Sequence, residues 1–171
     1  MQITVLMEDT CQNPACEYEH GLSLYIEAKG YKILVDTGAS DKTISNAAKL
    51  GVDLSETDFV VLSHGHYDHA GGIPGFRKIN EKAVIYMQRT ALDEYYHAER
   101  YIGVDPAIGR LPKIAFLTGD LEITGDISIL TGFTGNRFRP GSNLGLTRRV
   151  DGQDVQDDFA KIKHAQEARG I

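Results

Sequence analysis

The chain of 171 residues is long enough for one domain with a real core and too short for two comfortable ones. Its hydrophobic fraction of 42% and charged fraction of 25% are ordinary for a globular protein, and its net charge of -6 argues against nucleic acid or an anionic membrane as a partner. No apolar stretch reaches the length of a membrane span, and the N-terminal residues lack the pattern of a signal peptide. We therefore expect one cytoplasmic domain over residues 1–171.

The first hundred residues predict strands that come first in a hairpin and then alternate with helices. Apolar or alternating runs predict strands over 3–7, 22–28, 31–38, 58–63 and 83–87. Lys29 and Gly30 lie between the second and third of these runs, which predicts a hairpin turn. Capping residues and apolar positions at helical spacing predict helices over 40–51, 72–82 and 89–100.

The remaining residues predict a second group of strands. Runs over 113–119, 121–124 and 126–132 are typical of consecutive antiparallel strands, the pattern after Gly132 decays into loop, and a short last helix is predicted over 157–170. Hairpins followed by strand–helix alternation indicate an α/β (α+β) fold, a mixed sheet with helices on its outer face.

The two cysteines, Cys11 and Cys16, lie close together in "TCQNPACEYEH". They could form a disulfide or act as soft metal ligands, and two free thiols in a loop of an intracellular protein are the simpler interpretation.

The segment "SHGHYDHAGG" over 63–72 concentrates imidazoles and a carboxylate directly after a buried strand. In an extended segment, side chains two positions apart point the same way, so we expect His64, His66 and Asp68 on one side and His69 on another. Two adjacent ligand sets favour two neighbouring metal ions, and this donor chemistry suits zinc, iron or manganese. Solvated loop histidines, the alternative, would explain neither the concentration nor the preceding strand.

The same residues resemble a known family. "SHGHYDHAGG" is similar to the His-x-His-x-Asp-His motif of the metallo-β-lactamase superfamily, and "VDTG" over 35–38 resembles the strand-end aspartate that precedes this motif. More narrowly, "EHGLSLYIEA", "NAAKLGVDLSETDFVVLSHGHYDHAGG", "RYIGVDP" and "DGQDVQDDF" resemble the dihydropterin–ribofuranosylaminobenzene phosphate synthase-like branch, linked to methanopterin-type cofactor biosynthesis. The resemblance covers Met1 to about Phe159 and implies a metallo-β-lactamase-like αββα sandwich, mainly its N-terminal half.

The resemblance also implies roles for particular residues. His64 and His66 would bind one divalent metal ion, zinc or alternatively iron or manganese, and Asp68 and His69 would bind a second. Asp68 would be the catalytic group that orients or deprotonates a water molecule. Asp36 would hydrogen-bond a ligand histidine and fix its tautomer, although a turn at a strand end explains an Asp-Thr-Gly sequence equally well.

The chain departs from the family in its second half. The family supplies there a third histidine on a Gly-Cys-Ser-His-like loop, a bridging aspartate and a final histidine, whereas this chain reads "DDFAKIKHAQEARGI" over 157–171. Each metal would then have two ligands from the motif, with His164, His97, His20 and the cysteines as local substitutes. A lone histidine on a short helix, such as His164, is more often a surface residue than a ligand. We therefore expect a C-terminally truncated or frameshifted relative, or a half that completes itself by association.

Arginines in a glycine-rich loop are weaker candidates for substrate contacts. Guanidinium groups bind phosphate and carboxylate bidentately, which would suit a phosphorylated substrate for Arg137 and Arg139, with Arg148 and Arg149 nearby. A solvated loop is the alternative. "YYHAERY" over 95–101 could stack on a pterin ring, but aromatic residues at helical spacing more often belong to a core.

Together the motif and the resemblance predict a metal-dependent hydrolase of small molecules, and the resemblance implies more narrowly a pterin-transferring synthase acting on a phosphorylated or pterin-like substrate. The alternative is a non-catalytic metal-binding remnant or half-domain. Because half a sandwich leaves an apolar sheet face uncovered, we expect a homo-oligomer.

Overall fold

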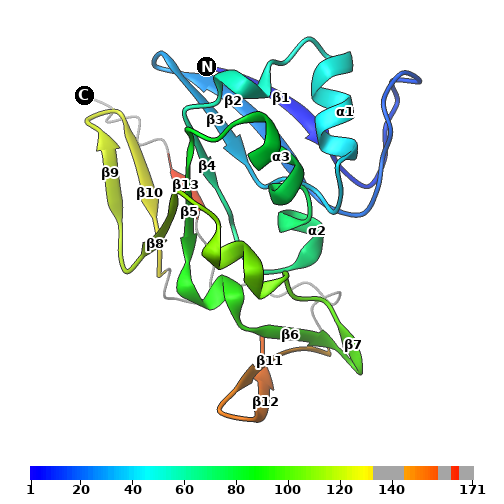
Figure 1. Cartoon of the computed structure of the whole chain (residues 1–171), viewed down its shortest axis with the longest axis vertical. Helices are drawn as coiled ribbons and strands as arrows, with labels where there is room; N and C mark the ends of the chain where they lie inside the picture. Colours follow the sequence, from blue (N-terminus) through cyan, green and yellow to red (C-terminus); the bar gives the residue numbers. More distant parts are fainter. Residues whose placement is uncertain (133–144, 158–162, 166–171) are drawn as a thin grey trace.

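A computed structural model describes residues 1–132 and 145–157, together with the backbone of 163–165. Its largest sheet has the strand order β1-β2-β3-β4-β5-β8 (Figure 1). The first three strands pair antiparallel and the last four pair parallel, so the sheet is mixed, as predicted. Its strands are β1 (Gln2–Met7), β2 (Ser23–Ala28), β3 (Tyr31–Val35), β4 (Phe59–Val61), β5 (Val84–Gln88) and β8 (Ile114–Leu117).

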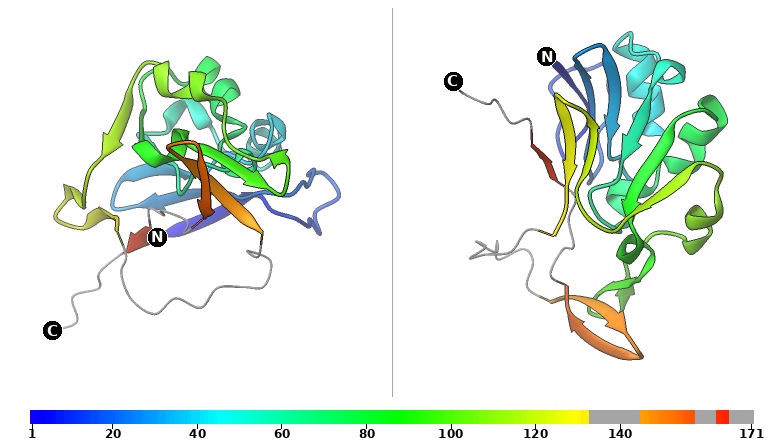
Figure 2. Two further views of the ribbon diagram at one scale, coloured as in Figure 1. Left: turned by 90° about the horizontal axis from the view of Figure 1, so that it is seen from below. Right: turned by 90° about the vertical axis from the view of Figure 1, so that its left-hand side faces the viewer.

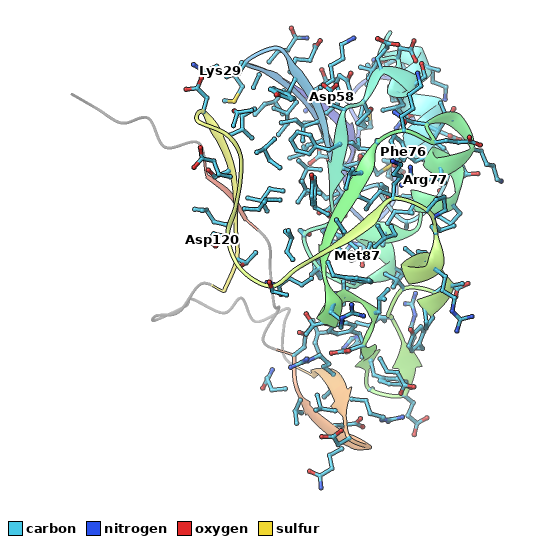
Figure 3. All side chains as sticks on the ribbon, turned by 60° about the vertical axis from the view of Figure 1, so that its left-hand side comes forward. Lys29, Asp58, Phe76, Arg77, Met87 and Asp120 are labelled. Atoms are coloured by element: carbon cyan, nitrogen blue, oxygen red, sulfur yellow. The ribbon has the colours of Figure 1, made fainter. Side chains whose placement is uncertain are left out.

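Helices cover one face of this sheet (Figure 2). Phe76 on a helix packs with Leu34, Val60 and Met87 of the sheet in one buried cluster, and Figure 3 shows Phe76 and Met87 on this side. None of the helices in the described ranges combines the length and apolarity needed to span a membrane. The helical segments are α1 (Lys42–Lys49), η1 (Leu54–Glu56), α2 (Tyr67–Ala70), α3 (Ile73–Ile79), η2 (Arg89–Leu92) and η3 (Pro106–Arg110).

A second, three-stranded sheet lies against the opposite face, with the order β13-β10-β9 (Figure 2). It contains β9 (Leu121–Thr124), β10 (Ile127–Leu130) and β13 (Lys163–Ala165). Ile129 is fully buried in a cluster with Ile33, Val35, Phe59 and Val61 of the large sheet. Two sheets with helices outside the larger one give the helix–sheet–sheet part of an αββα sandwich, as predicted. The expectation of an uncovered second sheet face is wrong at the centre of that face, because this small sheet packs on it.

The hairpin predicted at Lys29 and Gly30 is present. Ala28 pairs with Tyr31, and both turn residues have positive φ, 53° and 83°, which is the backbone that a two-residue turn between twisted strands needs. Lys29 lies 3.5 Å from Asp126 on the β9–β10 turn, so the tips of the two hairpins are in contact (Figure 3).

The prediction of a helix over 89–100 is wrong. Only Arg89–Leu92 is helical, as a 3₁₀ turn, and strands β6 (Glu94–His97) and β7 (Arg100–Tyr101) follow. They belong to a sheet with the order β12-β11-β6-β7, in which β11 (Leu146–Val150) pairs with β6 and β12 (Gln153–Gln156). The partner of β6 is far away in the sequence, and periodicity within 89–100 carries no information about it.

Three further expectations in the second half need correction. The strand within 113–119 pairs parallel with β5 and is not antiparallel to β9, whereas the β9–β10 hairpin itself is antiparallel. The chain after Gly132 contains β11 and β12, while 133–144 lie outside the described residues. Within the helix predicted over 157–170, Lys163–Ala165 is a strand beside β10, and 158–162 and 166–170 are not described.

Candidate metal centre

The histidine cluster lies where two neighbouring parallel strands end. Val35 of β3 pairs with Val61 of β4, and the backbone N–H of Asp36 donates to the carbonyl of Val61 over 3.0 Å. The residues that follow the two strands, Asp36 and 63–69, therefore meet at the carboxyl edge of the sheet. Open α/β sheets commonly place their chemistry at this edge.

The cluster segment is only partly extended. His66 forms an antiparallel bridge with Gly103, and helix α2 begins at Tyr67, so Asp68 and His69 are helical residues. The predicted two-residue alternation therefore ends at His66, and the expectation that His69 faces away from the other histidines is wrong. The ring centroids of His64 and His69 are 4.1 Å apart, and those of His64 and His66 are 4.5 Å apart.

Asp36 is the buried carboxylate beneath this cluster, with 1% of its surface exposed. Its Oδ1 accepts the backbone N–H of Ser63, and its Oδ2 accepts the Ser63 hydroxyl and Nδ1–H of His69, each over 2.7 Å. The hydrogen bond between Asp36 and a histidine of the motif is thus present. Asp36 has φ 55°, a left-handed conformation that aspartate tolerates better than most residues and that accompanies its turn toward the cluster.

Ser63 extends this network to His64, and sequence reasoning missed its role. Its Oγ lies 2.9 Å from Nδ1 of His64. Because the single hydroxyl proton goes to Asp36, we assign Nδ1–H of His64 as the donor to Ser63. Both His64 and His69 then carry the proton on Nδ1, which leaves Nε2 as the nitrogen with the lone pair that a metal ion requires.

His66 is oriented by Asp157, a second residue that sequence reasoning missed. Its Nε2 lies 2.9 Å from Oδ2 of Asp157, and both side chains are buried. A metal-binding His66 would therefore use Nδ1. The sequence stretch "DGQDVQDDF" contains Asp157, but several aspartates occur there and only the fold singles out this one.

His20 contacts Asp68 at the edge of the cluster. Oδ2 of Asp68 lies 3.4 Å from Nε2 of His69 and 3.5 Å from Nε2 of His20, whose Nδ1 is 3.0 Å from Asp9.

His97, another histidine considered as a substitute ligand, is an exposed residue of β6. The backbone of His164 belongs to β13, so the helix on which it was expected is not formed there.

The donor set fits a divalent metal ion. Three imidazoles and the Asp68 carboxylate gather at one edge, and hydrogen bonds to carboxylates or a serine fix the rings, as in protein metal sites. No three His, Cys, Asp or Glu side chains within the described ranges are arranged closely enough to hold an ion as they stand. Both cysteines are free thiols, as the simpler interpretation predicted.

The arginine candidates divide into two pairs. Arg137 and Arg139 lie outside the described residues. Arg148 and Arg149 belong to strand β11 and not to a loop, and each contacts a carboxylate, Asp93 at 2.8 Å for Arg148 and Asp154 at 2.8 Å for Arg149. The hydrogen bonds from Arg149 hold the pKa of the Asp154 carboxyl below its usual value.

The tyrosines over 95–101 lie on strands β6 and β7 and not on a helix. The buried ring of Tyr95 packs edge-on against His66, with centroids 5.1 Å apart, while Tyr96 and Tyr101 contact each other across β6 and β7. Burial, with the charge of Glu94 nearby, raises the pKa of Tyr101.

Oriented imidazoles and carboxylates at the strand ends of a helix-covered sheet, with a second sheet behind it, define the class of proteins that carry a candidate metal centre on part of an αββα fold. Comparison with known proteins narrows this class. The sequence profile of the metallo-beta-lactamase superfamily matches residues 18–136, and the chain belongs to that superfamily.

Individual relatives agree with this membership. The chain is 34% identical over 141 residues to a UPF0173 metal-dependent hydrolase of Staphylococcus aureus and 36% identical over 108 residues to the uncharacterized protein MJ0448 of Methanocaldococcus jannaschii. Those alignments cover 80% and 61% of this chain, and 58% and 40% of the relatives. A match over 74 residues, at 35% identity, links 40% of this chain to 25% of the 7,8-dihydropterin-6-methyl-4-(beta-D-ribofuranosyl)-aminobenzene-5'-phosphate synthase of M. jannaschii.

A solved structure shares the fold along most of this chain. The crystal structure of Tm1679, a metal-dependent hydrolase of the beta-lactamase superfamily, superposes with a TM-score of 0.76 at 31% identity. The superposition covers 94% of this chain and 58% of Tm1679. The chain thus spans about half the length of the relatives it matches.

The cluster segment needs glycine at position 65. A Cβ atom there would collide with the backbone of Ala91, whereas a Cβ atom at Gly119 would meet open space. We predict that Gly65→Ala lowers the free energy of unfolding by about 1–3 kcal/mol, because the backbone between His64 and His66 must shift. Gly119→Ala, the matched control, should change it by less than about 0.5 kcal/mol. Urea denaturation of both variants measures this, and equal midpoints would contradict the prediction.

Proposed function

We propose that the chain acts as a metal-dependent hydrolase whose centre is built by His64, His66, Asp68 and His69. The observation that carries the proposal is the Asp36 network, which orients His69 directly and His64 through Ser63. Hydrogen bonds of this kind fix the tautomer and direction of metal-binding imidazoles. Solvated loop histidines would not need a buried carboxylate beneath them.

The residues of the centre have separate tasks in this proposal. Zinc, iron or manganese, as one ion or a pair, would polarise the substrate and lower the pKa of a coordinated water molecule. Asp68 would orient the attacking water and accept its proton, since its carboxylate lies beside His69 at the rim of the cluster. Asp36 and Asp157 would hold the imidazoles in place and take no part in the proton transfer.

The proposed substrate is a small phosphorylated or pterin-like molecule. Support comes from the partial match to the dihydropterin-linked synthase and from the arginines of the glycine-rich sequence, of which Arg137 and Arg139 would bind phosphate. Transfer of a pterin group is the narrower form of the proposal, and hydrolysis is the broader form. The cytoplasm is the proposed location.

A metal-binding half-domain is the second candidate. It is favoured by the observation that, in the part of the chain that the structure describes, no three ligands form a closed group. In this reading the single domain over 1–171 keeps the fold of its relatives but reaches activity only after association with a second copy or with a C-terminal half like that of the family.

The edge of the large sheet offers a surface for such association. Ile3 and Val5 of β1 pair with Ile26 and Leu24 of β2, so they lie on the face that the small sheet covers only in part. Each is 50% exposed. An apolar, half-exposed edge strand is a site where another chain can add, and we propose that it supports a homo-oligomer.

Metal binding is the first test. We predict that the purified chain retains zinc, iron or manganese after dialysis and that His64→Ala/His66→Ala retains less, because it loses two imidazole ligands. Elemental analysis and calorimetry of both proteins measure the difference, with His97→Ala as a control that should match the wild type. Equal metal content in the wild type and the double variant would contradict the proposal.

Catalysis is the second test. With excess zinc or manganese, the 171-residue chain should hydrolyse phosphoester or lactone substrates slowly, because the motif supplies two ligands per ion where a catalytic ion usually has about three. Fusing or adding the C-terminal half of a relative should raise the turnover rate, and Asp68→Ala should remove the gain. High turnover by the chain alone, abolished by Asp68→Ala, would show that its own residues complete both ion sites.

Association is the third test. Sedimentation at micromolar concentration should show a homo-oligomer, and Ile3→Lys/Val5→Lys should shift it toward the monomer, because charges at the sheet edge oppose strand pairing. Lys29→Ala, on the β2–β3 turn, is the control. A folded wild-type monomer under these conditions would rule out the oligomer.

A further inference from the structure

His20 occupies a position that neither the motif nor the comparisons explain. It precedes β2, more than forty residues before the motif in the sequence, and its Nε2 lies 3.5 Å from Oδ2 of Asp68. Nε2 of His69 approaches the same oxygen to 3.4 Å. Two imidazole nitrogens from separate segments therefore face one carboxylate oxygen.

The hydrogen bond made by Nδ1 of each ring determines which tautomer the neutral ring adopts, and therefore whether Nε2 carries a proton or a lone pair. Nδ1 of His20 lies 3.0 Å from Oδ1 of Asp9, and Nδ1 of His69 lies 2.7 Å from Oδ2 of Asp36. A carboxylate accepts, so each neutral ring carries its proton on Nδ1. In the neutral form each Nε2 directs a lone pair toward the oxygen of Asp68, whereas a doubly protonated ring would donate a hydrogen bond to it. A cation between the three atoms would stabilise the neutral form.

The spacing of each imidazole nitrogen from the Asp68 oxygen matches that of neighbouring ligands around one ion. In a tetrahedral zinc site with bonds of about 2.0–2.1 Å, neighbouring ligand atoms are about 3.3–3.4 Å apart. The contacts of 3.4 and 3.5 Å with Asp68 are close to this value. A histidine that binds a metal ion through one ring nitrogen usually donates the N–H of the other to a carboxylate. Asp9 and Asp36 are the carboxylates in that position for His20 and His69.

The backbone around His20 is fixed against the motif. The N–H of Leu22 donates to the carbonyl of Asp68, and Gly21 lies so close to that carbonyl that a Cβ atom would collide with it. Gly21 also has φ 143°, which favours glycine. Oδ1 of Asp9 accepts the N–H of Gly21 as well as facing His20, so the same carboxylate orients both the ring and the backbone.

We infer that His20 is the third protein ligand of the ion bound by Asp68 and His69, an inference that rests on the proposed function. The three side chains do not form a closed group as they stand. The His20 side chain, 71% exposed, is the one with room to move onto the ion, whereas those of Asp68 and His69 are 11% and 18% exposed.

The experiment measures metal stoichiometry and affinity of the full chain, not activity. Wild type, His20→Ala, His69→Ala and the surface-histidine control His97→Ala are titrated with zinc by calorimetry, and with cobalt to follow the visible absorption of a tetrahedral ion. We expect two ions for the wild type and His97→Ala. For His20→Ala and for His69→Ala we expect the loss of one ion, or a weakening of it by at least about tenfold, and a reduced cobalt absorption.

The outcomes separate the two claims. If His20→Ala binds both ions like the wild type while His69→Ala loses one, the His20–Asp68 contact is a surface ion pair and the inference is overturned, but the proposed function stands. If the wild type binds no metal, or His69→Ala binds like the wild type, the proposed function fails together with the inference. Circular dichroism of the variants verifies folding, which removal of the exposed imidazole should leave intact.

Discussion

The buried carboxylate of Asp36 joins the end of strand β3 to the start of the histidine cluster. A carboxylate in this position is stable only when hydrogen bonds replace its hydration, and here two N–H groups and a hydroxyl of Ser63 and His69 do so. The same bonds fix the tautomers of two imidazoles. The left-handed backbone of Asp36 and the hydrogen bond from its N–H to Val61 are therefore part of the site and not only of the turn.

Around this carboxylate the site is assembled from segments that are distant in the sequence. The Asp9–His20 pair comes from the loop before β2, the motif from the end of β4, and Asp157 from beyond β12. The loop that carries His20 is held on the sheet by the buried side chain of Asn46, which bonds the backbone of Leu6 and Glu17. A candidate ligand set of this kind depends on the sheet that fixes the ends of its strands.

The expectations from sequence were correct where local pattern and burial agree. Strands β3, β4 and β5 are short, largely apolar runs between turns, as is typical of parallel strands, and β4 is buried at every position. Over 89–100 the pattern was misleading: the tyrosines that fit a helix face pair instead with β11. The two-residue alternation also failed beyond His66, because helix α2 begins inside the motif.

The sequence by itself determined the class of fold, the types of candidate donor groups and the position of the motif, because these depend on residue types and on spacing within a few positions. Only the tertiary structure decided which neighbours orient each ring: Ser63 for His64, Asp157 for His66 and Asp9 for His20. One of these contacts is between adjacent residues and the others span 11 and 91 positions, so spacing gives no common rule. The contacts of His66 and His20 depend on where the sheet places the ends of its strands, which is a property of long-range pairing and not of local sequence.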